Sequence, residues 1–287
     1  MSVDILQEKI RKLKCPIVVD LSMLPEHIPA TMQMNDSLAE AYREYCLALM
    51  GGMKGAVPAV RFCFDQFALM DGLNVLSDLL RNATEMGFYV ILDAPNVNTP
   101  WAAERAAKLL EEGSRYPCHA LITDPYIGSD VIKPFLPACK SGKTAFFAVR
   151  SANKSAVELQ DLMTGSRLVH VAAADLVNRH GEALVGKSGY SPVALLTAAT
   201  NTNAVMGLRS KYKKMFLLVD GLDYPGGNGK IASYGFDRLG HGCAVCVGPE
   251  ITAAWQKEDS DTATAVELAV KAAERIRNNF TRYITIL

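Results

Sequence analysis

Short apolar stretches recur along the chain, and most of them are continuous rather than alternating. Strands that are buried on both faces of a parallel sheet read as continuous apolar runs, whereas strands with one solvated face alternate. The pattern therefore predicts eight parallel strands. They are Ile17–Leu21, Val57–Phe64, Phe88–Leu92, Ala120–Thr123, Ala145–Val149, Val193–Thr197, Phe216–Val219 and Cys243–Val247.

The segments between these runs carry helix signals. Thr99 precedes Pro100, which places a capping hydroxyl before a proline at the first helical position. Eight strand-then-helix units predict one α/β domain over residues 1–287, a (β/α)8 (TIM) barrel, with an additional N-terminal helix at Ile5–Leu13. A doubly wound open sheet is the alternative, but the GxGxxG that would favour it does not follow the first run.

Composition narrows the class of protein. Of the 287 residues, 49% are hydrophobic and 21% are charged, which is typical of a folded core and not of a disordered chain. Thirty basic residues balance thirty acidic ones, so neither nucleic acid nor an anionic membrane is favoured as a partner. Most of the seven cysteines lie in apolar runs and the first fourteen residues lack a signal-peptide core, so we expect a cytoplasmic protein.

Polar residues at the ends of the apolar runs are the candidates for chemistry, because barrel active sites lie at the carboxyl ends of the strands. Acidic residues dominate this set, and hard divalent cations prefer carboxylate ligands. We predict no bound cofactor or metal; the alternative ligands for a cation are Asp20, Asp93, Asp124 and Asp220. The competing interpretation is that these carboxylates pair with Arg61 and Arg150 or cap turns.

Glycines are concentrated in the loop after the seventh run, at Gly221, Gly226 and Gly227. They either let backbone N–H groups approach a phosphate or serve a tight turn with positive φ. The loop after the eighth run has no basic residue, and Pro249 has no N–H to donate. Phosphate binding at this corner is therefore the less favoured interpretation.

Two other motifs are interpreted as structural. Cys243 and Cys246 form a CxxC inside an apolar strand, where alternation directs the two sulfurs to opposite faces. The histidines stand at strand starts or in helix bodies, as at His119 and His170, and no Ser/His/Asp or Cys/His set is evident.

Several segments resemble the long bacterial branch of the orotidine 5′-monophosphate decarboxylases. Ala120–Leu136 contains Pro-Tyr-x-Gly and Pro-Phe-Leu, and Phe146–Asn153 is followed by a Leu-Gln-Asp segment within Glu158–Leu162. Val57–Val60, Gly186–Ser191 and Ala253–Trp255 fit in order. The resemblance implies a (β/α)8 barrel that forms a homodimer with its sites at the dimer interface.

The sequence differs from that family at the positions of the family's catalytic residues. The family motif Asp-x-Lys-x-x-Asp corresponds to residues 93–98, where Asp93 is retained, Pro95 replaces the lysine and Asn98 replaces the second aspartate. The resemblance implies that this lysine protonates the carbanion left by CO2 and that the second aspartate comes from the other subunit. Arg61 stands at a further lysine position, and Ser22 at that of a ribose-binding aspartate.

The phosphate-binding positions also differ. The family segment Pro-Gly-x-Gly-x-Gln-Gly corresponds to Asp220–Gly226, so Pro225 replaces the glutamine, and Pro249 replaces the arginine expected after the eighth strand. The positions that still correspond to substrate-binding ones are Ser22, Asn153, Gly221, Gly226 and Gly227.

Three functions remain open from the sequence. The favoured one is a decarboxylase-like barrel that does not decarboxylate orotidylate and is retained as a binding, regulatory or partner subunit for a nucleotide or another small molecule. The second is a barrel repurposed for another reaction, assisted by a divalent metal. The third is a working decarboxylase that forms uridine 5′-monophosphate in pyrimidine biosynthesis.

Overall fold

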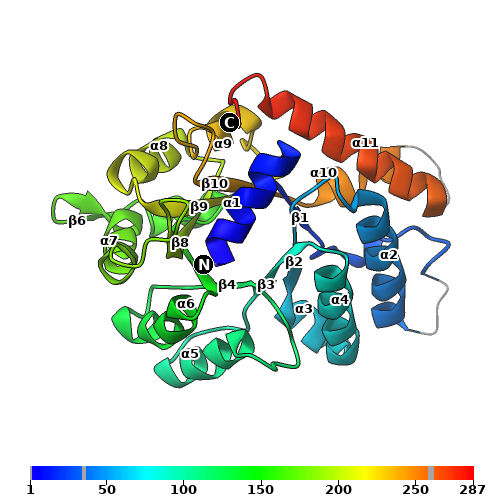
Figure 1. Cartoon of the computed structure of the whole chain (residues 1–287), viewed down its shortest axis with the longest axis horizontal. Coiled ribbons are helices and arrows are strands. Elements are labelled where there is room, and N and C mark those ends of the chain that lie inside the picture. Colours follow the sequence, from blue (N-terminus) through cyan, green and yellow to red (C-terminus); the bar gives the residue numbers. More distant parts are fainter. Residues whose placement is uncertain (1, 34–36, 258–261) are drawn as a thin grey trace.

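Eight parallel strands form a closed barrel in the order β1-β10-β9-β8-β5-β4-β3-β2 (Figure 1). The computed structural model describes residues 2–33, 37–257 and 262–287. The barrel strands are β1 (Ile17–Asp20), β2 (Ala59–Cys63), β3 (Tyr89–Asp93), β4 (Ala120–Thr123), β5 (Thr144–Ala148), β8 (Ser191–Ala198), β9 (Met215–Asp220) and β10 (Cys243–Val247). Each of the eight predicted runs overlaps one of them. The predicted (β/α)8 barrel is confirmed over the open sheet.

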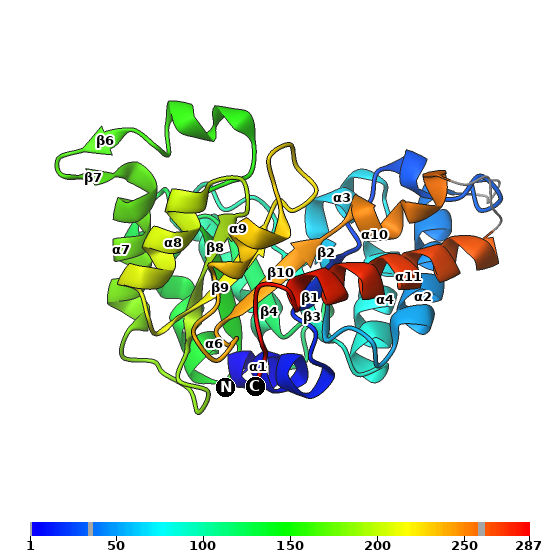
Figure 2. The ribbon, with the colours of Figure 1, turned by 90° about the horizontal axis from the view of Figure 1, so that it is seen from above.

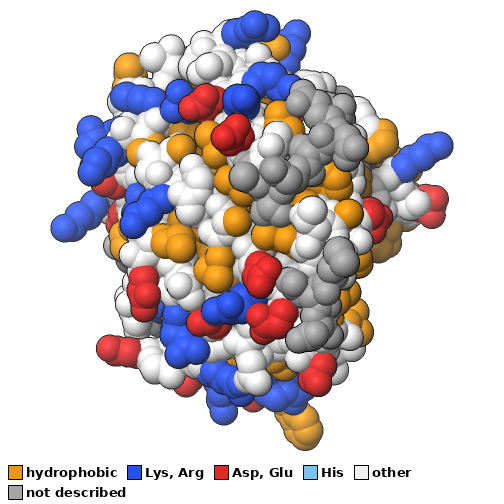
Figure 3. Space-filling model, turned by 90° about the vertical axis from the view of Figure 1, so that its right-hand side faces the viewer, with side chains coloured by type: hydrophobic (Ala, Val, Ile, Leu, Met, Phe, Trp, Pro, Cys, Tyr) orange, Lys and Arg blue, Asp and Glu red, His pale blue; other side chains and the backbone are white. Residues whose placement is uncertain are grey.

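Helices surround the barrel (Figure 1). They are α2 (Leu38–Met53), α3 (Phe64–Leu69), α4 (Leu73–Glu85), α5 (Pro100–Ala107), α6 (Leu136–Lys140), α7 (Val169–Gly181), α8 (Thr202–Lys211), α9 (Gly229–Ser233), α10 (Pro249–Thr252) and α11 (Thr262–Phe280). A small antiparallel hairpin of β6 (Met163–Thr164) and β7 (Arg167–Leu168) lies in the connection between β5 and α7. Over the face that carries α2, α4 and α11, positive and negative side chains are interspersed (Figure 3). No helix among the described residues is long and apolar enough to cross a membrane.

The N-terminal helix closes one end of the barrel. The helix α1 (Ser2–Leu13) begins three residues before the predicted start and buries Val3, Leu6 and Ile10 among the interior side chains of the strands. The hydroxyl of Ser2 lies 2.6 Å from that of Tyr89 on β3. Figure 2 shows α1 at one end, with the β6–β7 hairpin and the β9–α9 loop at the other. We call the opposite end, where the carboxyl ends of the strands lie, the mouth.

Strand alternation sorts the buried side chains into two sets. One set, including Val18, Ile91 and Phe146, fills the inside of the barrel, and the other packs between strands and helices. Cys246 belongs to the inner set and Cys243 to the outer one, and both thiols are free. The prediction that the two sulfurs of the CxxC diverge is confirmed.

Candidate functional site

Four charged residues end their strands with side chains directed into the mouth. Val18, Ala59, Ile91 and Leu218 belong to the inner set of buried side chains. Two residues later on the same strands, and so on the same face, stand Asp20, Arg61, Asp93 and Asp220. The two-residue period of the strand therefore brings one guanidinium and three carboxylates to the top of the same interior.

Arg61 binds all three of these carboxylates. Its Nη2 lies 2.6 Å from Asp93 Oδ2, and its Nη1 lies 2.9 Å from Asp220 Oδ2 and 3.1 Å from Asp20 Oδ2. Only 12% of the arginine side chain is exposed. Its Nε is buried and has no nitrogen or oxygen acceptor among the described residues, and the Cys246 thiol is the neighbouring side chain with which Arg61 also interacts.

The charges of this cluster perturb one another. Burial opposes the charged form of Arg61, but Asp20, Asp220 and Asp93 raise its pKa well above the ordinary value. Burial raises the pKa of Asp93, although Arg61 acts against that increase. One positive charge faces three carboxylates, so the mouth remains electronegative.

A cavity of about 340 Å³ opens beside the cluster. Its wall combines charged, amide and apolar side chains, which suits a ligand with both polar and apolar parts. The lining residues include Arg61, Asp93, Pro95, Asn96, Val97, Ile122, Asp124, Ser151, Asn153, Leu196, Asp220 and Tyr224. Within the described part of the chain, no lysine lines this cavity.

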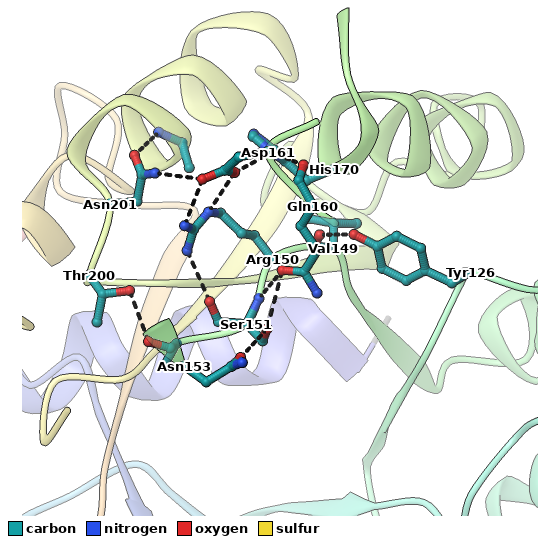
Figure 4. Close-up of polar contacts among 12 residues, drawn as sticks. Tyr126, Val149, Arg150, Ser151, Asn153, Gln160, Asp161, His170, Thr200 and Asn201 are labelled. Atoms are coloured by element: carbon teal, nitrogen blue, oxygen red, sulfur yellow. Dashed lines mark hydrogen bonds and ion pairs between the residues drawn. The ribbon is translucent and has the colours of Figure 1, made fainter. Parts of the chain in front are cut away.

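One wall of the cavity is held by a network in the segment between β5 and α7 (Figure 4). The buried Arg150 donates from Nε and Nη2 to both carboxylate oxygens of Asp161, at 3.0 and 2.9 Å. Asp161 also lies 3.2 Å from His170 Nδ1. The hydrogen bond from Arg150 lowers the pKa of Asp161. Arg150 is therefore a structural clamp and does not pair with the carboxylates of the mouth.

The same network holds the residues that face the cavity. Gln160 Oε1 accepts hydrogen bonds from the backbone N–H of Ser151 at 2.9 Å and from its hydroxyl at 3.1 Å. The Ser151 hydroxyl also lies 2.6 Å from Asn153 Oδ1 (Figure 4). Thr200 Oγ1 donates to the carbonyl of Ala152 at 3.3 Å. Asn153, a predicted substrate-binding residue, thus lines the cavity in a fixed loop.

The other predicted site residues fall into two groups. Pro95 lines the cavity, whereas Asn98 is exposed and outside it. Ser22 also lies outside the lining; its backbone N–H donates to Asp20 Oδ1 at 2.9 Å and so orients that carboxylate. Asp124 lines the cavity and accepts from the N–H of Tyr126 at 2.7 Å, so it caps a turn.

The glycines after β9 serve the turn. Gly221 and Gly226 have φ angles of 77° and 90°, which favour glycine, and a Cβ on Gly227 would lie 2.0 Å from the carbonyl oxygen of Gly221. Asp223, in the same loop, accepts hydrogen bonds from the backbone N–H groups of Gly248 and Glu250. No local pattern in the sequence reveals these contacts.

The predicted alternative ligands for a metal ion are used otherwise. Asp20, Asp93 and Asp220 share Arg61, and Asp124 caps its turn, as the competing interpretation proposed. Among residues 2–33, 37–257 and 262–287, no group of three or more His, Cys, Asp or Glu side chains is arranged to hold a metal ion.

Comparison with known proteins gives a consistent relationship. No family model matches the chain. The orotidine 5′-phosphate decarboxylase of Rhodopirellula baltica is 26% identical over 254 residues, covering 85% of this chain and 84% of the relative. That of Clostridium kluyveri is 26% identical over 285 residues, or 97% of each chain. This chain is related to the orotidine 5′-phosphate decarboxylases.

Solved structures agree on the fold. The orotidine 5′-monophosphate decarboxylase of Leishmania donovani superimposes with a TM-score of 0.71 at 22% identity, over 96% of this chain and 99% of that one. The Plasmodium berghei enzyme gives 0.73 at 12% identity, over 98% and 100%. The barrel of this chain thus has the same fold as these solved structures.

Proposed function

We propose that this decarboxylase-like barrel binds a small molecule in its mouth and does not decarboxylate orotidine 5′-phosphate. The observation that carries the proposal is that Arg61, the cation in the mouth, is already paired with carboxylates. Arg61 is bound to three carboxylates, and Pro95 lines the cavity at the position that corresponds to the lysine of the family motif. Loss of CO2 from a substrate leaves a carbanion that needs a proton. A guanidinium stays protonated in proteins, and proline has no side-chain proton to transfer.

Binding is supported by what the mouth retains. The cavity has a wall held by Gln160 and Arg150, apolar surface from Ile122 and Leu196, and the amide of Asn153. Such a mixture of apolar surface and a few fixed polar groups is typical of small-molecule sites. The barrel therefore serves as a binding, regulatory or partner subunit.

The test is an orotidine 5′-phosphate turnover assay sensitive enough to follow CO2 release against a protein-free blank. We expect no release above the blank from the native chain. Asp93→Asn is the matched control, because it removes one carboxylate from Arg61 while preserving the shape of the side chain. Turnover by the native chain that is lost in Asp93→Asn would show a working decarboxylase and contradict the proposal.

We also propose that the chain forms a homodimer through its mouth face. Large apolar side chains are exposed in the segments that follow β2, β3 and β5, with Leu69 90%, Trp101 74% and Leu159 58% exposed. Exposed apolar side chains of this size favour association with a partner. Sedimentation equilibrium should give a dimer that Trp101→Glu weakens and Ile5→Glu, at the opposite end, does not. A monomeric native chain would contradict this.

A further inference from the structure

One carboxylate ties the loop after β9 to the loop after β10. Asp223 Oδ2 accepts a hydrogen bond from the backbone N–H of Gly248 at 2.7 Å, and Oδ1 accepts one from the N–H of Glu250 at 3.0 Å. Pro249, between them, has no N–H. Both backbone donors at this corner of the mouth are therefore bound to a side chain of the protein itself.

This corner is where (β/α)8 barrels commonly bind a phosphate group of their ligands, through backbone N–H groups of the loops after the seventh and eighth strands. In this chain an internal anion already occupies such donors. A phosphate could reach them only by displacing Asp223. The displaced carboxylate would remain beside the phosphate, because it is held in a turn fixed by Gly221 and Gly227.

The surroundings add to the unfavourable interaction with an anion. The carboxylates of Glu250 and Asp220 lie close enough for their negative charges to act on Asp223. Arg61 is already bound to three carboxylates. Arg275 lies 3.4 Å from Glu250 in an exposed pair. The neighbouring cations thus have carboxylate partners of their own.

We propose that Asp223 is a specificity-determining residue, whose carboxylate occupies the anion position between the two loops and restricts the mouth to small molecules without a phosphate group. The carboxylates of Asp93, Asp124 and Asp220 in the cavity wall are acceptors that suit hydroxyl or amino groups on such a ligand. The proposal rests on the proposed function, because it concerns a barrel whose ligand is not orotidine 5′-phosphate.

The test is a titration of the full, ¹⁵N-labelled chain with inorganic phosphate, followed at the backbone amide signals of Gly248 and Glu250. We expect Asp223→Ala to bind phosphate roughly tenfold more tightly than the native chain, because a nearby like charge is removed and two donors are released. Asp223→Asn, which keeps an acceptor oxygen without the charge, should fall between them. This second variant provides the comparison if Asp223→Ala does not fold.

The matched control is Asp237→Ala. Asp237 Oδ1 also accepts two backbone N–H bonds, from Leu239 and His241 at 2.8 Å each, but it lies in the loop that precedes β10, at the other end of the barrel. This variant should leave phosphate binding at Gly248 and Glu250 unchanged.

Two results would overturn the proposal. One is saturable binding of phosphate to these two amides in the native chain with an affinity equal to that of the folded variant. The other is the absence of any gain in either folded Asp223 variant. The CO2-release assay tests the proposed function separately, so failure of that proposal is distinguishable from failure of the proposal about Asp223.

Discussion

Replacing Arg61 by methionine tests whether the charge cluster in the mouth is held as the structure indicates. Methionine preserves much of the side-chain length but leaves Asp20, Asp93 and Asp220 without their shared cation. Removing one member of a buried ion pair typically costs about 3–5 kcal/mol, because a charge remains buried without a partner. The carboxylates here are between 17% and 30% exposed, so we expect the lower end, about 3 kcal/mol.

The assay is urea unfolding of both proteins across a range of pH. Arg61 opposes the increase that burial causes in the pKa of Asp93, so without Arg61 this pKa rises further in the folded state and the folded variant takes up a proton more readily than its unfolded chain. The stability of the variant should therefore increase as the pH falls from neutral towards the ordinary carboxyl range, near pH 4. The difference from the native protein should shrink over the same interval.

The matched control is Arg43→Met. Arg43 pairs with Asp78 at 2.8 Å, but its side chain is 37% exposed, and exposed pairs contribute about 0–1 kcal/mol. A loss at Arg61 no larger than that at Arg43, or a loss that is the same at pH 5 and pH 8, would refute the reasoning.

Three further predictions concern the scaffold. The Nδ1 atom of His119 accepts a hydrogen bond from the N–H of Val90, and burial lowers the pKa of His119 to about 4. Because the unfolded chain binds a proton at this residue more readily, the free energy of unfolding should fall by about 3 kcal/mol between pH 6.5 and pH 4. Guanidinium unfolding should show this fall in the native chain and a smaller one in His119→Asn. Asp161→Asn should cost about 3 kcal/mol in urea unfolding and speed hydrogen exchange in residues 150–168; an unchanged exchange rate there would contradict the clamp role of Arg150. Leu6→Ala should cost about 2–5 kcal/mol in thermal unfolding, against at most about 0.5 for the exposed Ile5→Ala; equal losses would contradict the closing role of α1.

The fold was predictable because its signals are local. A strand buried on both faces needs consecutive apolar residues, and β4 is predicted with its observed bounds, Ala120–Thr123. The Thr99–Pro100 signal marks the start of α5, where Thr99 Oγ1 accepts from the N–H of Ala102 at 3.1 Å. Each of these features depends on residues within a few positions of one another.

The candidate site was predictable only in part. The rule that barrel chemistry lies at the carboxyl ends of strands located Arg61, Asp93 and Asp220. It also included Arg150, which the structure places in a structural clamp with Asp161, and it did not reveal that Asp223 binds the loop after β10. Polar residues at strand ends look alike in a sequence, because alternation and loop path decide which ones face the mouth.

The sequence by itself determined the barrel and its N-terminal helix, because these follow from the period of the apolar positions. Only the tertiary structure decided which charges meet. Arg61 reaches Asp220, 159 residues away, and Asp223 reaches Gly248 across two loops. Such pairs form when closure of the barrel brings distant strand ends within about 3 Å, and nothing in the neighbouring residues encodes the choice of partner.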